Sequence, residues 1–281
     1  YRNVHLIITE DAYIPVWGTY ITTPSVNEKF AKVNVRTKVV LPEGADPAKY
    51  SVETSVWNPN KQKLTAVRTS LAQMKYNNNQ AEQEFVIQTP SLWSPEMPAL
   101  YSAETRLYEG DKLKDIYTTP FGIRSIEIIP DKGFFLNGKR TVFKGVCNHH
   151  DLGPLGAAVN DAAIRRQIRI LKDMGCNAIR TSHNMPAPEL IRACDEMGMM
   201  IMAESFDEWN VAKCKNGYNL LFDEWAEKDL VNLLHNFRNN PSVVMWCIGN
   251  EVPNQWNEGD CKIAKWLQDI CHREDPTRPV T

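Results

Sequence analysis

The chain has 281 residues, which is enough for about two domains and a sizeable hydrophobic core. It carries 32 Lys and Arg against 34 Asp and Glu, and the two signs are interspersed, so it lacks the basic stripe with which nucleic-acid-binding proteins contact phosphates. A hydrophobic content of 43% beside 23% charged residues excludes a disordered or fibrous chain.

No stretch approaches the roughly 20 apolar residues of a membrane-spanning helix, so we expect a soluble protein without a membrane partner. The chain begins at Tyr1 with neither Met nor a signal peptide, which leaves the compartment open between cytoplasm and periplasm. All seven Cys lie at or after Cys147 and none forms a Cys-x-x-Cys pair. This pattern argues against a disulfide framework, a zinc site or a redox pair. It predicts instead that the cysteines are buried and act as small hydrophobic residues.

Residues 1–120 have the pattern of a β domain. Apolar and polar residues alternate over 32–39, 52–56 and 101–107, as in half-buried strands. Turn-forming clusters stand between them, namely Pro42-Glu43-Gly44, Asn58-Pro59-Asn60, Asn77-Asn78-Asn79 and Glu109-Gly110-Asp111. Several short strands separated by turns predict a β-sandwich. The Cys…Trp…Cys signature of antibody domains is absent, so packing alone must hold this sandwich.

From about residue 121 the pattern changes to strands that alternate with helices. Short apolar runs predict strands at 141–146, 176–179, 199–203 and 243–248. Apolar residues at helical spacing predict helices over 164–174, 188–197, 225–237 and 263–270, the first two ended by Gly175 and Gly198. Residues 277–281 have the pattern of the approach to a fifth strand.

Four strand–helix units with fully apolar strands predict a parallel sheet covered by helices. Both a doubly wound sheet and a (β/α)8 barrel fit this pattern. The chain has no Gly-x-Gly-x-x-Gly run after a strand, which favours the barrel. A whole barrel takes about 250 residues, and the segment from 121 to the end is much shorter, so we expect half a barrel.

Polar residues follow all four predicted strands, at the rim where barrel enzymes hold their active sites. They are Asn148-His149-His150-Asp151 after the first, Arg180-Thr181-Ser182-His183-Asn184 after the second, Glu204 with Asp207, Glu208 and Trp209 after the third, and Gly249-Asn250-Glu251 after the fourth. Because parallel strands end at one edge of the sheet, the joint pattern predicts a functional site at this rim.

Glu251 is the strongest catalytic candidate among these residues. It follows an apolar run, so we expect its carboxyl group at the mouth of a low-dielectric core, where desolvation raises a pKa and supplies a general acid. A helix cap or a rim ion pair is the alternative. Its neighbour Asn250 could hydrogen-bond a substrate hydroxyl or cap a turn.

The other rim residues each have a functional and a structural interpretation. His149 and His183 could donate to substrate oxygens, ligate a metal, or serve as structural hydrogen-bonding groups. The adjacent His149 and His150 should face opposite sides if they lie in a strand. Arg180 could orient a carboxylate by a bidentate pair or form a plain ion pair. Trp209 could offer a face on which a sugar stacks, or pack within a loop.

Several segments resemble signatures of glycoside hydrolase family 2, and they occur in the family's order. They are Leu92-Trp-Ser-Pro95, Phe121-Gly-Ile-Arg124, Gly133-Phe-Phe-Leu-Asn-Gly-Lys139, Gly145-Val-Cys-Asn-His149, Asn177-Ala-Ile-Arg-Thr-Ser-His-Asn-Met-Pro186 and Trp246-Cys-Ile-Gly-Asn-Glu251. Within the family, the chain looks most like bacterial β-galactosidases. The resemblance spans nearly the whole chain.

The resemblance implies a multidomain β plus α/β fold. By the family's pattern, residues 1–18 would be the tail of a preceding jelly-roll sugar-binding domain. Residues 19–122 would form an immunoglobulin-like β-sandwich, and residues 123–281 the N-terminal half of a catalytic TIM (β/α)8 barrel.

The resemblance also implies a chemistry, the retaining hydrolysis of terminal β-D-galactosides by double displacement, with two carboxyl groups about 5–5.5 Å apart. Glu251 would be the acid/base and Asn250 would contact the sugar 2-hydroxyl. His149 and His183 would line the subsite, and Arg180 would position the nucleophile's carboxylate.

The family's nucleophile belongs at the end of the seventh strand. The acidic residues after Glu251 are Glu258, Asp260, Asp269, Glu274 and Asp275. We expect the first three in or near the fourth helix and the last two in the turn after it, so none qualifies. The chain alone is therefore expected to be inactive.

Some family members hold Mg²⁺ through the acid/base Glu, a Glu after the third strand and a nearby His. Glu208 matches the second of these ligands, but Asn210 stands where the His would be, so no metal or other cofactor is predicted. By the same resemblance Glu204 looks like a site-shaping or cation-binding residue.

Four alternatives remain at this stage. Within the family they are β-glucuronidase and β-mannosidase. Outside it, a metal-dependent hydrolase could gather His149, His183 and Glu204 around zinc, although their spacing matches no ligand signature. The fourth is a non-catalytic carbohydrate-binding or interaction module. Half a barrel also leaves open sheet edges, which predicts pairing with a second copy in a homo-oligomer.

Overall fold

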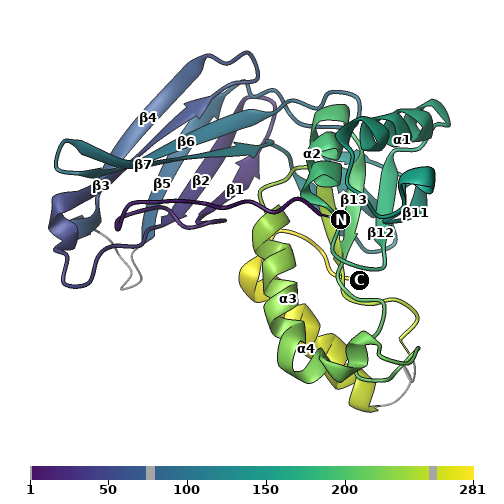
Figure 1. The fold of residues 1–281 in the computed structure, drawn as a ribbon. Helices are drawn as coiled ribbons and strands as arrows, with labels where there is room; N and C mark the ends of the chain where they lie inside the picture. Colours follow the sequence, from purple (N-terminus) through teal and green to yellow (C-terminus); the bar gives the residue numbers. More distant parts are fainter. Residues whose placement is uncertain (1, 74–79, 253–257) are drawn as a thin grey trace. The chain divides into compact units, whose positions relative to one another are not determined.

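The computed structural model describes residues 2–73, 80–252 and 258–281 (Figure 1). The described chain forms two compact units, one of residues 4–125 and one of residues 126–281 together with Arg2 and Asn3. The first is all β and the second is α/β, as the change of pattern near residue 121 predicts. The predicted turn at Asn77-Asn78-Asn79 lies outside the described residues.

The first unit consists of two antiparallel sheets, ordered β1-β2-β5 and β4-β3-β6-β7. Its strands are β1 (Thr19–Val26), β2 (Phe30–Lys38), β3 (Tyr50–Trp57), β4 (Lys63–Ser70), β5 (Gln80–Gln88), β6 (Tyr101–Glu109) and β7 (Lys112–Phe121). Two 3-10 turns, η1 (Pro47–Lys49) and η2 (Leu71–Gln73), connect them. Two packed sheets of this kind are a β-sandwich, as predicted.

The alternating pattern of β2 explains how the sandwich is held. Val33 and Val35 are fully buried and pack in one cluster with Phe85 from β5, while the residues between them face outward. Ala12 and Ile14, which precede β1, pack into a second cluster of the same unit. The unit contains no cysteine, so its core rests on packing.

The second unit opens with a small antiparallel sheet and continues as a parallel one. The small sheet holds β8 (Ile126–Ile129), β9 (Gly133–Leu136) and β10 (Lys139–Arg140). The parallel strands are β11 (Gly145–His149), β12 (Ala178–Ser182), β13 (Met200–Glu204) and β14 (Val243–Cys247), in that order. Val280 pairs in parallel with Trp246, which fits the predicted approach to a fifth strand.

Four helices connect and follow the parallel strands. They are α1 (Asp161–Asp173), α2 (Pro188–Met197), α3 (Phe222–Phe237) and α4 (Glu258–Glu274), with 3-10 turns η3 (Gly153–Leu155) and η4 (Tyr218–Leu220). Helices α1 and α2 pack side by side, as do α3 and α4 (Figure 1). The caps follow ordinary rules, because the Asn160 side chain accepts the Ala163 amide and Gly198 ends α2 with a φ of 73°.

The helices cover one face of the parallel sheet and leave the other open. Ile201 and Trp246 belong to the same buried cluster as Ile168 of α1, Leu230 of α3 and Leu267 of α4. The opposite face is hollowed by a cavity of about 270 Å³. Its lining includes Cys147, Arg180, Met202 and Met245. Four parallel strands with helices outside and a concave inner face are part of a (β/α)8 barrel.

Two predicted strands are displaced from the observed ones. The segment predicted at 141–146 belongs largely to the connection from β10, since the Thr141 amide bonds Phe134 of β9. The strand begins at Gly145 instead, where pairing with Ala178 of β12 starts, and a side chain at residue 145 would meet the Ala178 carbonyl oxygen at 2.9 Å. The second strand begins only at Ala178, because the Cys176 amide still bonds Leu171 and closes α1.

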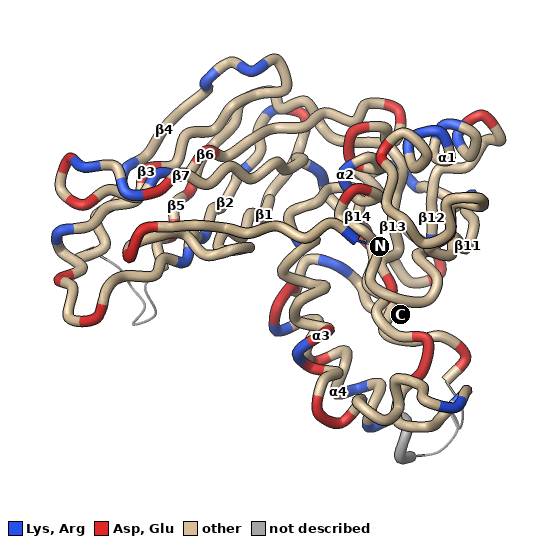
Figure 2. Tube along the Cα trace, in the orientation of Figure 1, with Lys and Arg blue, Asp and Glu red and all other residues tan. Residues whose placement is uncertain are grey.

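Charges of both signs are spread along both units, without a single-sign stripe (Figure 2). Among the described residues, no helix has the length and apolarity needed to cross a bilayer. The prediction that the cysteines are buried is only partly correct. Cys194, Cys247 and Cys271 are buried, whereas three others are exposed, namely Cys147, Cys214 and Cys261.

Candidate active site

The predicted rim residues come together because all four parallel strands end on one edge of the sheet. His149 is the last residue of β11, His183 follows β12 directly, and Glu204 is the last residue of β13. Asn250 and Glu251 lie in the turn after β14. Parallel pairing of His149 with Ser182, and of Glu204 with Cys247, aligns these strand ends.

Glu204 is the centre of this rim. Its side chain is fully buried, with Nε of Arg180 2.7 Å from Oε2 and Nδ1 of His183 2.8 Å from Oε1. Its backbone amide donates to the hydroxyl of Thr181. Burial raises the pKa of Glu204, and the hydrogen bond from His183 and the charge of Arg180 offset this only in part. The carboxyl group is thus held rigidly between two side chains from the neighbouring strand.

Arg180 connects the ends of all four strands. Besides its ion pair with Glu204, its guanidinium donates to Oδ1 of Asn250 at 3.0 Å and to Sγ of Cys147 at 3.7 Å. The planar guanidinium presents five donors in fixed directions, so one side chain can satisfy several partners at once.

Asn250 is held on its other side by two charged residues. Its Nδ2 donates to Oδ1 of Asp207 at 2.9 Å, and Nζ of Lys213 lies 3.0 Å from the same carboxylate oxygen. The Lys213 ammonium also donates to the backbone carbonyl of Asn250 at 2.7 Å. Burial alone would raise the pKa of Asp207, but the hydrogen bonds from Asn250 and Lys213 outweigh it and lower this pKa.

Glu251 does not occupy the buried position expected for it. Its side chain is exposed, and its backbone has a φ of 44°, whereas the next residue, Val252, is buried. The left-handed turn therefore carries the carboxyl group outward and packs Val252 inward. Because the four-stranded sheet is open on its inner side, the Glu251 carboxyl group is exposed, and the prediction that it is buried is wrong for this chain.

His149 ends β11 and His150 follows the strand, so the condition for the predicted alternation, that both lie in a strand, is not met. His149 is exposed and its ring lies edge-on to the ring of His183, with 5.0 Å between the centroids. His150 turns away, and its Nε2 lies 2.8 Å from the carbonyl oxygen of Ala157. His149 and His183 thus share one side of the rim and His150 does not.

Trp209 lies in the core instead of on the open rim. Its indole is 5% exposed, and Nε1 donates to the carbonyl of Ile248 at 2.8 Å. Gly249 makes room for it, since a Cβ there would come within 2.9 Å of the indole nitrogen. The sugar-stacking face predicted for Trp209 is therefore not available, and the packing interpretation fits its position.

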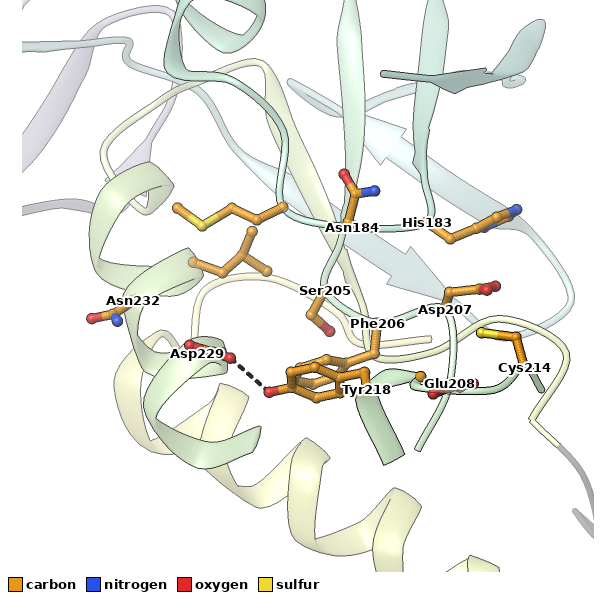
Figure 3. Close-up of a pocket in the computed structure, with 13 residues that line it drawn as sticks. His183, Asn184, Ser205, Phe206, Asp207, Glu208, Cys214, Tyr218, Asp229 and Asn232 are labelled. Atoms are coloured by element: carbon orange, nitrogen blue, oxygen red, sulfur yellow. Dashed lines mark hydrogen bonds between the residues drawn. The ribbon is translucent and has the colours of Figure 1, made fainter. Parts of the chain in front are cut away.

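A pocket of about 480 Å³ lies beside the rim, and its lining includes His183 and Asp207 (Figure 3). Phe206 and Tyr218 stack within it, with 5.3 Å between ring centroids. The Tyr218 hydroxyl donates to Asp229 at 2.6 Å, and burial raises the pKa of Tyr218. Sequence reasoning missed these aromatic residues, because they lie in a loop where no periodic pattern marks them.

The residues do not fit the magnesium site that some family members have. Both carboxylate oxygens of Glu208 accept backbone amides, from Lys213 and Asn219, at 2.8 Å. Asn210, where a His ligand would stand, is exposed. Among the described residues, no group of three or more His, Cys, Asp or Glu side chains could hold a metal ion, so the zinc alternative gains no support.

The acidic residues after Glu251 lie in α4 and directly after it. Glu258, Asp260, Asp269 and Glu274 belong to α4, with Glu274 as its last residue instead of in the turn beyond it. Asp275 is fully buried, where it bonds Arg278 and the indole of Trp246.

Comparison with protein families gives two adjacent matches. Residues 13–124 match the model described as "Glycosyl hydrolases family 2", and residues 127–281 match "Glycosyl hydrolases family 2, TIM barrel domain". Together these two matches cover nearly the whole chain.

Individual relatives are similar over most of this chain. A β-galactosidase of Bacteroides ovatus is 44% identical over 92% of the chain, and a β-glucuronidase of Bacteroides fragilis is 31% identical over 100%. The crystal structure of a glycosyl hydrolase family 2 member from Bacteroides cellulosilyticus matches 97% of the chain with 36% identity and a TM-score of 0.90. The chain spans only 30%, 41% and 35% of the lengths of these three proteins.

Proposed function

The chain belongs to glycosyl hydrolase family 2, and from that premise we propose that it is part of a retaining glycosidase acting on terminal β-D-galactosides. The observation that carries the proposal is the rim cluster, in which Arg180 contacts both Glu204 and Asn250, next to Glu251. Such a convergence of strand-end polar groups at one barrel rim is typical of the active site of a barrel enzyme, and the family match supplies the glycosidase chemistry.

In the proposed reaction the two carboxyl groups act in two steps. Glu251 gives its proton to the glycosidic oxygen while a carboxylate from the remaining part of the barrel attacks the anomeric carbon, so the aglycone leaves as an alcohol. Glu251, now a carboxylate, removes a proton from water, whose oxygen displaces the enzyme carboxylate from the sugar. The exposed position of Glu251 in this chain leaves it accessible to such a substrate.

The other rim residues have supporting roles in the proposal. Asn250 donates to the sugar 2-hydroxyl, His149 and His183 line the sugar subsite, and Arg180 orients the nucleophile's carboxylate. The edge-on contact of the two histidine rings and the hydrogen bond from Arg180 to Asn250 support this arrangement. Trp209 is left out of the substrate contacts because it is buried.

The choice of galactose is supported by the 44% identity to a protein named β-galactosidase. The 31% identity to a β-glucuronidase makes a glucuronide the second candidate. Nitrophenyl β-galactoside, β-glucuronide and β-mannoside, offered to the full-length parent protein, separate these substrates. Binding of galactose without turnover of any of the three would instead favour the non-catalytic module.

The role of Glu251 is tested in the same full-length protein by Glu251→Gln. Removal of a general acid should lower kcat/KM by about 10²- to 10⁴-fold for alkyl galactosides, whose leaving groups need protonation. A dinitrophenyl galactoside, whose leaving group needs no proton, should lose much less in its first step. Equal activity of both proteins on alkyl galactosides would overturn the proposal.

A further inference from the structure

The loop between β13 and α3 places two charged side chains against Asn250. Asp207 lies three residues after the end of β13, and Lys213 lies six residues further along the loop. The three groups form a closed set of contacts, in which Asn250 Nδ2 and Lys213 Nζ both bond Asp207 Oδ1. Lys213 Nζ completes the set by donating to the Asn250 carbonyl oxygen, 2.7 Å away.

These contacts determine which way the Asn250 amide faces. Arg180 has donors only, so it must meet the amide oxygen, and it does so at 3.0 Å. Ionised Asp207 has acceptors only, so it must meet the amide nitrogen. If the amide rotated by about 180°, the Arg180 guanidinium would face the amide NH2, donor against donor, and the Asp207 carboxylate would face the amide oxygen, acceptor against acceptor. One N–H of Asn250 is used by Asp207, and the second remains for a substrate.

The loop itself is anchored independently of the rim. The buried carboxylate of Glu208 accepts the backbone amides of Lys213 and Asn219, each at 2.8 Å. Gly217 is required for close approach, because a Cβ there would lie 1.9 Å from Oε1 of Glu208. The backbone that carries Lys213 is therefore fixed, and its side chain reaches the rim from a rigid base.

We propose that Asp207 and Lys213 are positioning residues, which hold the Asn250 amide in one orientation and fix the peptide that leads into Glu251. Neither residue bonds the sugar in this role. Asp207 directs the free N–H of Asn250, and Lys213 restrains the carbonyl one bond before Glu251. The inference rests on the proposed glycosidase function, and it gives a role within that function to two residues that the proposed reaction does not use.

The test of Asp207 uses the full-length parent protein and two substrates. Asp207→Ala should lower kcat/KM for a nitrophenyl β-galactoside by about 10- to 100-fold, because a small misplacement of a contacting group is costly. The same substitution should cost much less on the 2-deoxy-galactoside, which lacks the hydroxyl group that Asn250 contacts. In an Asn250→Ala background, Asp207→Ala should cause little further loss, since the two residues act as a unit.

Lys213→Met tests the second residue, with Lys215→Met as the matched control from the same exposed loop. We expect Lys213→Met to lower kcat by about 10-fold with little change in KM, and Lys215→Met to leave both unchanged. For Asp207→Ala, equal losses on both substrates, or full additivity with Asn250→Ala, would show a merely structural role and overturn the inference. For Lys213→Met, a loss of kcat no larger than that of Lys215→Met would do the same. If Asp207→Ala does not fold, Asp207→Asn, measured on the same two substrates and in the Asn250→Ala background, decides the same question. An unmodified parent that hydrolyses no glycoside would instead refute the proposed function.

Discussion

Glu251 combines a candidate catalytic side chain with an unfavourable backbone conformation. A φ of 44° belongs to the left-handed region, where a Cβ crowds the backbone and costs roughly 1–2 kcal/mol. Strain of this kind is found preferentially at functional sites, where the surrounding structure imposes it. The backbone conformation that places the Glu251 carboxyl group at the rim therefore lowers the stability of the folded chain.

We predict that Glu251→Gly stabilises this chain by about 1 kcal/mol, because glycine has no Cβ and adopts positive φ freely. Glu251→Gln keeps the Cβ and should leave the free energy of unfolding nearly unchanged. Urea denaturation of the two variants measures the difference. Equal stability of the glycine and glutamine variants would show that the turn is unstrained.

Glu204 gives a second prediction at this scale, for the pH dependence of stability. Its pKa is raised above the unfolded value, mainly by burial, so its contribution to stability is full below the unfolded pKa and is lost as pH rises through the folded pKa. Glutamine does not titrate. The stability of Glu204→Gln relative to the original chain should therefore increase as pH rises from the unfolded pKa of Glu204 through its raised folded pKa. Denaturation curves at several pH values check this, and a constant difference would contradict it.

At the scale of elements, regular segments could be read from the sequence and contacts across the loops could not. Helix α2 runs over Pro188–Met197 as predicted, because proline opens it and Gly198 ends it. Strand β11 was displaced, because its start depends on a close approach to Ala178 that no local pattern contains. The grouping of polar residues at the rim was predictable, because the carboxyl ends of parallel strands lie at the same edge of a sheet whatever the local sequence.

The loop from β13 to α3 shows why the rest was not predictable. The backbone bonds of Glu208 and the contact of Lys213 with Asn250 join residues that differ in sequence position by 5 to 37. The local signal was limited to two opposite charges, Asp207 and Lys213, in the loop that follows β13. The burial of Trp209 also depends on a residue distant in sequence, because Gly249 has no side chain and leaves space for the indole ring.

We predict that Gly217→Ala disrupts this loop, at a cost of about 1–3 kcal/mol, because the added Cβ would overlap the Glu208 carboxylate. Its φ of −73° is ordinary, so space and not backbone conformation requires the glycine. The amide hydrogens of Lys213 and Asn219 should then exchange faster with solvent, while Lys215→Ala should leave them protected. Unchanged exchange in Gly217→Ala would contradict this account of the loop.

At the scale of the whole molecule, apolar surface is exposed on the parallel sheet and near the start of the chain, among other places. The inner face of the parallel sheet is hollow and is lined in part by Met202 and Met245. Near the start of the chain, Val4, Leu6 and Ile8 are 94%, 87% and 86% exposed. Exposed strand edges and apolar patches of this kind favour association.

We therefore expect this chain alone to self-associate as its concentration rises, which light scattering would detect. A monomer over the whole concentration range would contradict the expectation.

The chain alone should also fail to hydrolyse a nitrophenyl β-galactoside, since the proposed reaction needs a second carboxyl group as nucleophile, which we expect from the remaining part of the barrel. The measurement uses preparations free of host enzyme. Turnover that persists in Glu251→Gln would indicate a contaminating enzyme. Turnover that Glu251→Gln abolishes would refute the expected inactivity.

The reach of Arg180 has a consequence for how a growing polypeptide matures on the ribosome. Its pairing with Glu204 needs only the second and third parallel strands, whereas its bond to Asn250 needs the turn after the fourth. Chains emerge from the ribosome amino end first, so the ion pair of Arg180 with Glu204 forms before Asn250 is available. The Arg180 guanidinium is then already in place when Asn250 arrives. A nascent chain in which the second and third parallel strands have left the ribosome, but residue 250 has not, should already pair Arg180 with Glu204, before the Asn250 amide is available.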